Sequence, residues 1–369
     1  MTIGIDASRA NRLEKTGIEW YAYHLLHAMQ KIADPYDRFL LYTDTPLVEL
    51  TEILLMTRRW EERLLYWPLR KFWTQGRLSL EMLFRPPDIL FIPSHVIPIL
   101  HPKRVVLTCH DIGFERRPEL YPKAELAYHR WSMRFGVRAA THIIAVSEFT
   151  KRELMDVYKI PAEKITVIHH GFYGGGVSPM LMEEGYYNKD YPTSKFPYFL
   201  FVGRIEAKKN LKIVIDAFTK LKQEKKISNI TKLLLVGHLG YKGKRLLTHA
   251  RSVPFGADII YIPWIMAEAV SALYMGATAF LFPSLYEGFG LPLLEALSYG
   301  VPVIASDIPA LREIGGDAAI FSTPTVDGFA SAMQAIMDNP PTLVQKQQWK
   351  AHSERFSWED AARKTLTVL

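Results

Sequence analysis

The sequence has almost no cysteine and no long apolar run, which argues against a disulfide-bonded, a zinc-binding or a membrane-spanning protein. Cys109 is the one cysteine in 369 residues, so an internal disulfide cannot form and a cysteine-based zinc site has too few ligands. No stretch reaches the roughly 18 uninterrupted apolar residues of a membrane-spanning helix. The opening residues MTIGIDASRA also have no basic segment followed by an apolar one. We therefore expect a cytoplasmic protein without a structural metal.

Several functional motifs are missing as well. No serine or cysteine lies in an elbow-type sequence, which disfavours a hydrolase. There is no zinc finger, no RNP-like aromatic strand and no dense basic helix, so nucleic acid is not an expected partner. The 45 basic and 38 acidic residues nevertheless give a net charge of +7, which favours partners that carry phosphate or an anionic surface.

What is present is a long alternation of short apolar runs with amphipathic helical patterns. With 369 residues, 49% of them hydrophobic, the chain suits two domains of roughly 150–200 residues each. Buried strands separated by helices predict parallel sheets covered on both faces, and hence two doubly wound, Rossmann-like α/β domains. The expected strands are 3–6, 38–43, 88–93, 104–109, 142–147 and 165–170 in the first half, and 198–203, 232–237, 258–263, 278–283, 302–306 and 318–322 in the second.

The boundary between the two domains is visible in the composition. Residues 171–197 are rich in glycine, proline, tyrosine and polar side chains and lack periodicity, as a linker would. We expect domains over 1–170 and 198–356, with 357–369 as a closing helix. Ligands of such sheets bind beyond the carboxyl ends of the strands, so two such domains predict a ligand cleft between them.

A basic loop follows the expected strand at 198–203. Arg204, Lys208 and Lys209 precede a helical pattern that Asn210 is suited to cap. A guanidinium can fork onto phosphate oxygens, a lysine adds a point charge, and helix amides add partial positive charge. The loop therefore predicts an anion site. Taken alone, it would also fit a solvated surface loop.

Two carboxylates flank a second loop, in the stretch PSLYEGFGLPLLEALSYG. Glu287 lies in a glycine-rich turn after the strand at 278–283, and Glu295 lies one turn inside the helix that Pro292 favours. Carboxylates accept hydrogen bonds from hydroxyls, whereas the first amides of a helix donate to phosphate. A sugar nucleotide offers both kinds of group. The backbone groups expected to approach this ligand belong to Gly288, Phe289, Gly290 and Leu291.

In this order, the motifs resemble those of the retaining glycosyltransferases of family 4, also called glycosyl transferases group 1, which have the two-domain GT-B fold. The likeness is carried by Arg204 with Lys209, by EGFGLPLLE and by the following PVIAS. It extends into the first half through TCHDIGFERRPELYP, HIIAVSEFTKREL and KITVIHHGF. The resemblance implies a donor nucleotide in the C-terminal domain, an acceptor in the N-terminal domain, and a closing helix that crosses back to the N-terminal domain.

The resemblance also implies a role for individual residues. Arg204 and Lys209 would hold the diphosphate and stabilise the leaving group, Glu287 would bind the transferred sugar, and Glu295 the ribose. In the first domain, Gly17 would lie against the phosphates and His110 would face the sugar near the reacting carbon. His110 by itself would more often be a structural histidine. Gly203, Phe289, Gly290 and Leu291 complete the expected donor site.

A basic and aromatic stretch from Arg58 to Arg85 has two interpretations. It carries seven basic residues against three acidic ones, interleaved with aromatic side chains that include Trp67 and Trp73. If these lay on one helix, Trp67, Arg70, Lys71 and Trp73 would suit peripheral contact with an anionic membrane. A core-facing aromatic stripe with a solvated basic face fits equally well.

We therefore expect a retaining hexosyltransferase of polysaccharide biosynthesis that uses a UDP-, GDP- or ADP-sugar and a glycan or lipid-linked acceptor. No cofactor is expected. The sequence also has no Asp-x-Asp motif, and fixed cations can meet the charge of the leaving group, so the reaction is expected to need no metal. Two alternatives stay open: a sugar-nucleotide epimerase of the same fold, which needs no acceptor, and a non-catalytic sugar-nucleotide-binding protein.

Overall fold

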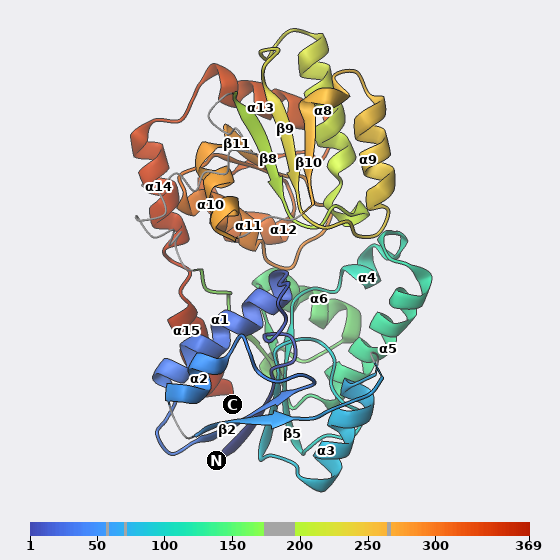
Figure 1. The fold of residues 1–369 in the computed structure, drawn as a ribbon, viewed down its shortest axis with the longest axis vertical. Helices are drawn as coiled ribbons and strands as arrows, with labels where there is room; N and C mark the ends of the chain where they lie inside the picture. The colour runs from blue at the N-terminus through green and yellow to red at the C-terminus, as the bar shows by residue number, and fades with distance from the viewer. Residues whose placement is uncertain (57–58, 70–71, 173–195, 264–266) are drawn as a thin grey trace. The chain divides into compact units, whose positions relative to one another are not determined.

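The computed structural model describes residues 1–56, 59–69, 72–172, 196–263 and 267–369 (Figure 1). The chain divides into two compact units. One consists of Met1–Gly171 with Phe356–Leu369, and the other of Phe172–Arg355. Most of the expected linker, residues 173–195, lies outside the described residues. Within the described ranges, every helix is too short or too polar to cross a bilayer.

The first unit is built on a parallel sheet. Among its described residues the strand order is β3-β2-β1-β4-β5-β6-β7. In the register of this sheet, Ile3 lies opposite Phe39 on one side and Ile89 on the other. The strands are β1 (Thr2–Asp6), β2 (Arg38–Thr43), β3 (Trp60–Leu64), β4 (Ile89–Ile92), β5 (Arg104–Cys109), β6 (His142–Ala145) and β7 (Ile165–Val167).

Helices cover both faces of this sheet, which explains the continuous apolar runs in its strands. Along β4, Ile89 and Phe91 face one core, whereas Leu90 and Ile92 face the other. A strand buried on both faces has no polar position in its pattern. The longer helices and turns are α1 (Gly17–Ile32), α2 (Thr51–Met56), the π-helix η1 (Thr74–Leu78), α3 (Ser79–Phe84), α4 (Gly113–Arg116), α5 (Lys123–Ala139) and α6 (Glu148–Tyr158).

The second unit repeats the plan with a sheet ordered β10-β9-β8-β11-β12-β13, parallel throughout its described strands. Its strands are β8 (Tyr198–Val202), β9 (Lys232–Val236), β10 (Ile259–Ile262), β11 (Ala279–Phe282), β12 (Val303–Ser306) and β13 (Ile320–Ser322). Its helices are η4 (Ala207–Lys209), α8 (Leu211–Gln223), α9 (Gly243–Ser252), α10 (Ala267–Gly276), α11 (Leu291–Ser298), α12 (Pro309–Gly315), α13 (Val326–Asp338) and α14 (Leu343–Ser353). The predicted pair of doubly wound α/β sheets is confirmed.

The last helix, α15 (Trp358–Val368), belongs to the first unit. Trp358 and Ala362 are buried in the same core as Ile3 and Ile5. Gly171 packs directly against the start of this helix, since a Cβ at that position would lie 2.1 Å from the backbone nitrogen of Trp358. The closing segment is therefore a structural part of the N-terminal core.

Candidate functional site

The loop after β8 is fixed by backbone contacts with the loop after β9. Gly203 has a φ of +146°, and a Cβ on Gly237 would lie 2.1 Å from the carbonyl oxygen of Gly203. The amide of Ile205 donates to the carbonyl of His238 at 2.8 Å. Between these fixed points the Arg204 side chain stays 55% exposed, with its Nε 3.7 Å from a carboxylate oxygen of Glu206. The loop therefore presents a guanidinium at the carboxyl end of the sheet.

Lys209 and Glu287, which are 78 residues apart in the sequence, meet in a nearly buried ion pair. The Lys209 Nζ lies 2.5 Å from Glu287 Oε1, and the two side chains are 14% and 11% exposed. Lys209 also lies over the ring of Phe282, the last residue of β11. The amide of Leu285 donates to the carbonyl of Lys208, which joins the loop after β8 to the loop after β11. The fold thus brings together two residues that the sequence placed in one site.

Glu287 is ionised despite its burial. Burial alone would raise the pKa of its carboxyl, but the charges of Lys209 and then Lys208 outweigh that effect and lower the pKa below its usual value. Lys208, the third cation of the predicted basic loop, therefore also acts on the carboxylate. The result is a compact cluster of opposite charges at the ends of β8 and β11.

The glycine-rich turn leads directly into α11. Gly290 has a φ of +131°, a backbone conformation that favours glycine, and a Cβ there would also press on Leu311 Cδ2 at 2.9 Å. Helix α11 begins at Leu291, one residue before the expected start, and the side chain of Phe289 is buried. Glu295 lies in the second turn of this helix. Its Oε2 accepts a hydrogen bond of 2.8 Å from the hydroxyl of Tyr274.

Asn210 stands where the sequence predicted a helix cap, but the predicted capping hydrogen bond of its side chain is wrong. Asn210 stands at the N-cap position of α8, but its backbone is left-handed (φ 53°) and its side chain makes no capping hydrogen bond. The short helix η4 over Ala207–Lys209 runs into α8, and asparagine tolerates the left-handed turn between them. Asn210 therefore sets the direction of the chain after Lys209.

In the first unit, Gly17 is the first residue of α1 and has open space beside its Cα. His110 follows β5 and is buried, with its ring 4.7 Å from that of Tyr21. Its Nε2 donates to the carbonyl of Pro93 at 3.0 Å, and burial lowers the pKa of the imidazole. The ring is therefore neutral near pH 7, with Nδ1 as an acceptor. Cys109 is buried in the core.

The predicted membrane residues require a correction. The stretch 58–85 is not one helix, because it contains β3, η1 and α3. Trp73 is 8% exposed and its Nε1 donates to the carbonyl of Leu65 at 2.9 Å. Trp67 is partly buried against the same core and against Gly76. The membrane prediction is wrong for Trp73, which fills the core, and Arg70 and Lys71 lie outside the described residues.

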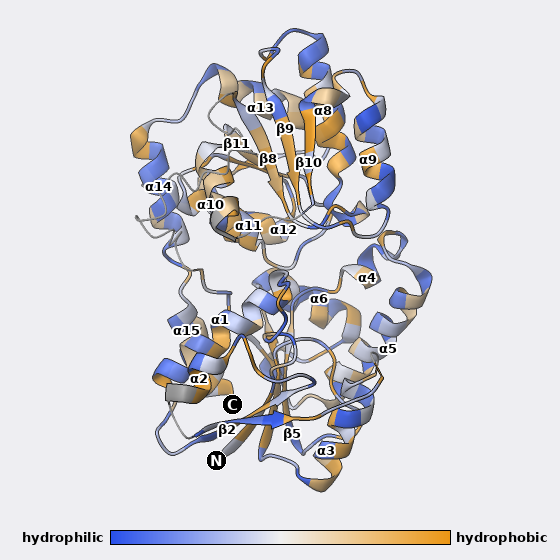
Figure 2. Ribbon diagram, viewed as in Figure 1, coloured by the Kyte–Doolittle hydropathy of each residue, from blue (hydrophilic) through white to orange (hydrophobic). Residues whose placement is uncertain are grey.

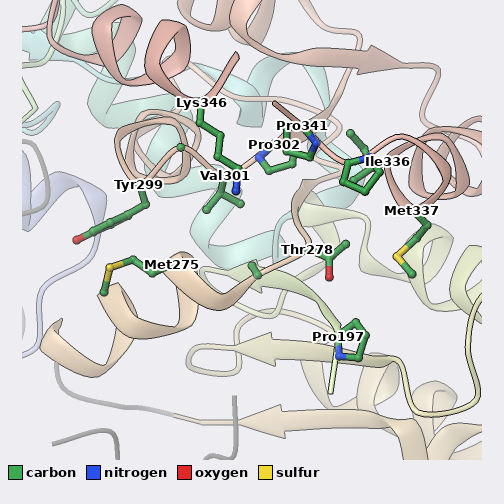
Figure 3. Close-up of a pocket in the computed structure, with 13 residues that line it drawn as sticks. Pro197, Met275, Thr278, Tyr299, Val301, Pro302, Ile336, Met337, Pro341 and Lys346 are labelled. Carbon is green, nitrogen blue, oxygen red and sulfur yellow. The ribbon is translucent and has the colours of Figure 1, made fainter. Parts of the chain in front are cut away.

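A cavity of about 340 Å³ lies at the opposite edge of the second sheet (Figure 3). Pro197, Thr278 and Pro302 line it and precede β8, β11 and β12, so it is at the amino ends of the strands. None of the predicted donor residues lines it. The candidate site is instead the polar cluster at the carboxyl ends. In the described part of the chain, no three His, Cys, Asp or Glu side chains gather as metal ligands would.

Two family models match this chain, one over each half. The model described as Glycosyltransferase Family 4 covers residues 15–172, and the model described as Glycosyl transferases group 1 covers residues 188–355. The chain is a family 4 glycosyltransferase. The predicted family is therefore confirmed, and with it an enzyme that takes its sugar from a nucleotide-sugar donor.

Curated relatives of the glycosyltransferase extend over most of its length. It is 29% identical over 308 residues to O-antigen chain mannosyltransferase B of Escherichia coli, covering 83% of this chain and 78% of that protein. It is 26% identical over 343 residues to O-antigen chain mannosyltransferase RfbU of Salmonella typhimurium, covering 89% of each.

Solved structures confirm the GT-B fold. Sucrose-phosphate synthase from Thermosynechococcus elongatus has a TM-score of 0.75 at 17% identity, covering 100% of this chain and 98% of that one. WaaG, a glycosyltransferase involved in lipopolysaccharide biosynthesis, has a TM-score of 0.70 at 12% identity, covering 100% and 99%. At these identities the likeness concerns the fold alone.

Proposed function

We propose that this glycosyltransferase moves a hexose, mannose, from a nucleoside diphosphate to a glycan or lipid-linked acceptor, with retention of the anomeric configuration and without a divalent metal. The observation that carries the proposal is the ion pair of Lys209 and Glu287, a cation and a carboxylate from two loops at the carboxyl edge of the C-terminal sheet. Mannose is the sugar transferred by the two O-antigen relatives, according to their names.

The charges of the cluster suit the parts of such a donor. Arg204 and Lys209 bind the diphosphate, Glu287 the hydroxyls of the hexose and Glu295 those of the ribose. When the diphosphate draws Lys209 to itself, Glu287 loses its partner and becomes free to accept sugar hydroxyls. One movement of the Lys209 Nζ thus couples diphosphate binding to recognition of the hexose.

The chemical step needs charge stabilisation at one oxygen. The bond from the anomeric carbon to the diphosphate oxygen breaks, the acceptor oxygen bonds to the same carbon, and the acceptor proton passes to the departing diphosphate. Arg204 and Lys209 stabilise the negative charge that develops there, with the backbone amides of 289–291 as further donors. In the N-terminal unit, Gly17 leaves room beside α1 for a phosphate, and the neutral His110 offers Nδ1 to a sugar hydroxyl.

A transfer assay tests the proposal and its alternatives. The protein is incubated with GDP-mannose, UDP-glucose, UDP-galactose and ADP-glucose, each with and without simple mannosides and prenyl-linked saccharides. We expect a product larger by one hexose that keeps the donor's anomeric configuration by NMR. A changed sugar on the nucleotide in the absence of acceptor would indicate the epimerase, and binding without turnover of any donor would indicate the non-catalytic protein.

We also propose peripheral contact with an anionic membrane, through residues other than the four expected from sequence. This apolar surface consists of Leu80, Leu83, Phe84, Ile99, Leu100 and Trp131, all more than a third exposed, with Phe84 reaching 76%. Two contacts join its parts: the amide of Leu100 reaches Ser79 Oγ of α3, and the ring of His101 packs on Phe135 of α5. Figure 2 shows the hydrophobic colouring of α3.

Charge complementarity favours a lipid surface as the occupant. The exposed cations Arg85, Lys103, Arg134 and Arg138 lie on the same segments, and an amphipathic tryptophan beside leucines and arginines suits the headgroup boundary. In liposome sedimentation, Leu83→Ser with Phe84→Ser should release the protein from vesicles with phosphatidylglycerol. Leu343→Ser with Val344→Ser on α14 is the matched control, because both residues are exposed there too. Equal binding by both variants would refute the assignment, and concentration-dependent dimers without vesicle binding would indicate a second copy of the chain.

A further inference from the structure

The carboxylate of Glu295 is held by a buried phenol. Tyr274 of α10 is 1% exposed, and its hydroxyl donates to Glu295 Oε2 at 2.8 Å. The Tyr274 ring itself is fixed by stacking on Tyr299, with 5.8 Å between centroids and 13° between planes, and by packing against Phe280. The position of the Tyr274 hydroxyl is therefore fixed by the packing of its ring.

The hydroxyl of Tyr274 acts as a donor whenever Glu295 is ionised. Burial raises the pKa of Tyr274 well above its usual value, so the phenol keeps its proton at any pH near neutrality. Burial also raises the pKa of Glu295, and the hydrogen bond from Tyr274 partly opposes this. A carboxylate in such a place is stabilised in its charged form by one specific neighbour.

The hydroxyl of Tyr299, which stacks on Tyr274, contacts Ser271 and not Glu295. Tyr299 Oη is 2.7 Å from Ser271 Oγ, one turn earlier than Tyr274 along α10. The two tyrosines thus share a stack but use their hydroxyls on different groups. This gives a matched pair of substitutions, since each tyrosine can lose one oxygen while the stack remains.

We propose that Tyr274 is a positioning residue for the donor's ribose: by holding Oε2 of Glu295, it turns Oε1 toward the ribose hydroxyls. The proposal deepens the proposed function and depends on it. A carboxylate has two oxygens, and a bond to one of them fixes the plane of the group. Without that bond, the carboxylate can rotate about its last torsion, and only some orientations present an oxygen to the sugar.

The test compares ribose with a ribose analogue that has no hydroxyls to offer. Calorimetry measures the affinity of UDP, GDP and ADP and of their 2′,3′-dideoxy analogues for the wild type, Tyr274→Phe, Tyr299→Phe and Glu295→Ala. A hydrogen bond to a charged group corresponds to a preference of roughly 10- to 150-fold for the ribonucleotide in the wild type. Glu295→Ala should abolish this preference.

We expect Tyr274→Phe to lower the preference by about 3- to 10-fold, which is less than the full loss in Glu295→Ala because the rotating carboxylate still reaches the ribose in some orientations. The affinity for the dideoxy nucleotide should be unchanged. Tyr299→Phe should keep the wild-type preference. In the Glu295→Ala background, Tyr274→Phe should have no further effect on the preference, because the group that it positions is gone.

Four results would contradict the inference or the function on which it depends. A Tyr274→Phe protein that binds both nucleotides more weakly by the same factor would show that Tyr274 only supports the local structure. An unchanged preference would also overturn the inference. A wild type that binds none of the six diphosphates would overturn the proposed function, and the inference with it. A wild type that binds them without preferring ribose would overturn the ribose-binding role of Glu295 and the inference with it, but not the proposed function.

Discussion

Replacing Glu287 with alanine removes the partner of a nearly buried cation. The Lys209 and Glu287 side chains are 14% and 11% exposed, with 2.5 Å between nitrogen and oxygen. Breaking a buried ion pair by deleting one member costs about 3–5 kcal/mol, because the other charge stays in a poorly solvated place. Since both side chains retain some contact with solvent, we expect the lower end of this range. At about 2–4 °C per kcal/mol for a unit of this size, the Tm should fall by about 6–12 °C.

The same variant should gain more from ligand than the wild type does. A bare nucleoside diphosphate supplies Lys209 with a new anion, and in Glu287→Ala it no longer competes with a carboxylate. We therefore expect its affinity for the diphosphate to equal or exceed that of the wild type, and its Tm to rise more when the diphosphate is added. Turnover should nevertheless be lost, since the contact with the hexose is missing.

Scanning calorimetry with and without the diphosphate, together with a turnover assay, measures all three effects. Asp327→Ala is the control: it removes an exposed carboxylate, paired with Lys220, from the same unit, and should leave the Tm and ligand response nearly unchanged. If Glu287→Ala kept the wild-type Tm, or bound the bare diphosphate much more weakly than the wild type, Glu287 would not be the stabilising partner of Lys209 that the diphosphate replaces.

Three further predictions concern the other charges. Arg204→Ala should lower kcat/KM by an amount equivalent to roughly 3–4 kcal/mol of transition-state stabilisation, with Arg204→Lys intermediate; near-normal turnover would show that Arg204 is only a surface charge. EDTA should leave transfer unchanged, and recovery of an EDTA-abolished activity on adding magnesium or manganese would contradict this. Glu295→Gln should raise the Tm at pH 8 but not at pH 4, because the raised pKa of Glu295 costs stability as the pH rises above the ordinary pKa of a glutamate, and fully so above its raised value in the folded state. An equal gain at both pH values would rule out ionisation as the cause.

The pattern of the sequence predicted nearly all of the sheet positions but missed one strand. The predicted runs at 38–43 and 104–109 match β2 and β5 in their bounds, since such strands are buried on both faces and read as continuous apolar runs. Strand β3, with the sequence WEERL, was not predicted. It lies at the sheet edge, beside β2 only, so its outer residues remain partly exposed and carry charges.

The same limit applies to the site. Motif spacing selected Lys209 and Glu287, and the fold brings them into contact because parallel strands β8 and β11 are neighbours and end at one edge. The sequence placed Lys208 in the basic loop but did not reveal its effect on Glu287, and it did not reveal Tyr274 at all. Both effects depend on which side chains burial brings together. It also left Trp73 undecided between a membrane surface and the core, because an aromatic residue in a basic stretch has the same pattern whether it packs inward or outward. Whether such a side chain lies in the core or at the surface has to be read from the structure.

In the proposed function, the nucleotide of the donor binds at the carboxyl edge of the C-terminal sheet. Hydrogen–deuterium exchange of the wild-type protein, measured by mass spectrometry with and without a saturating nucleoside diphosphate, tests it directly. We expect slower exchange in the peptides that cover residues 203–210 and 286–296. Protection confined to Met1–Gly171, or to the peptides that line the cavity at the amino ends of the strands, would contradict it.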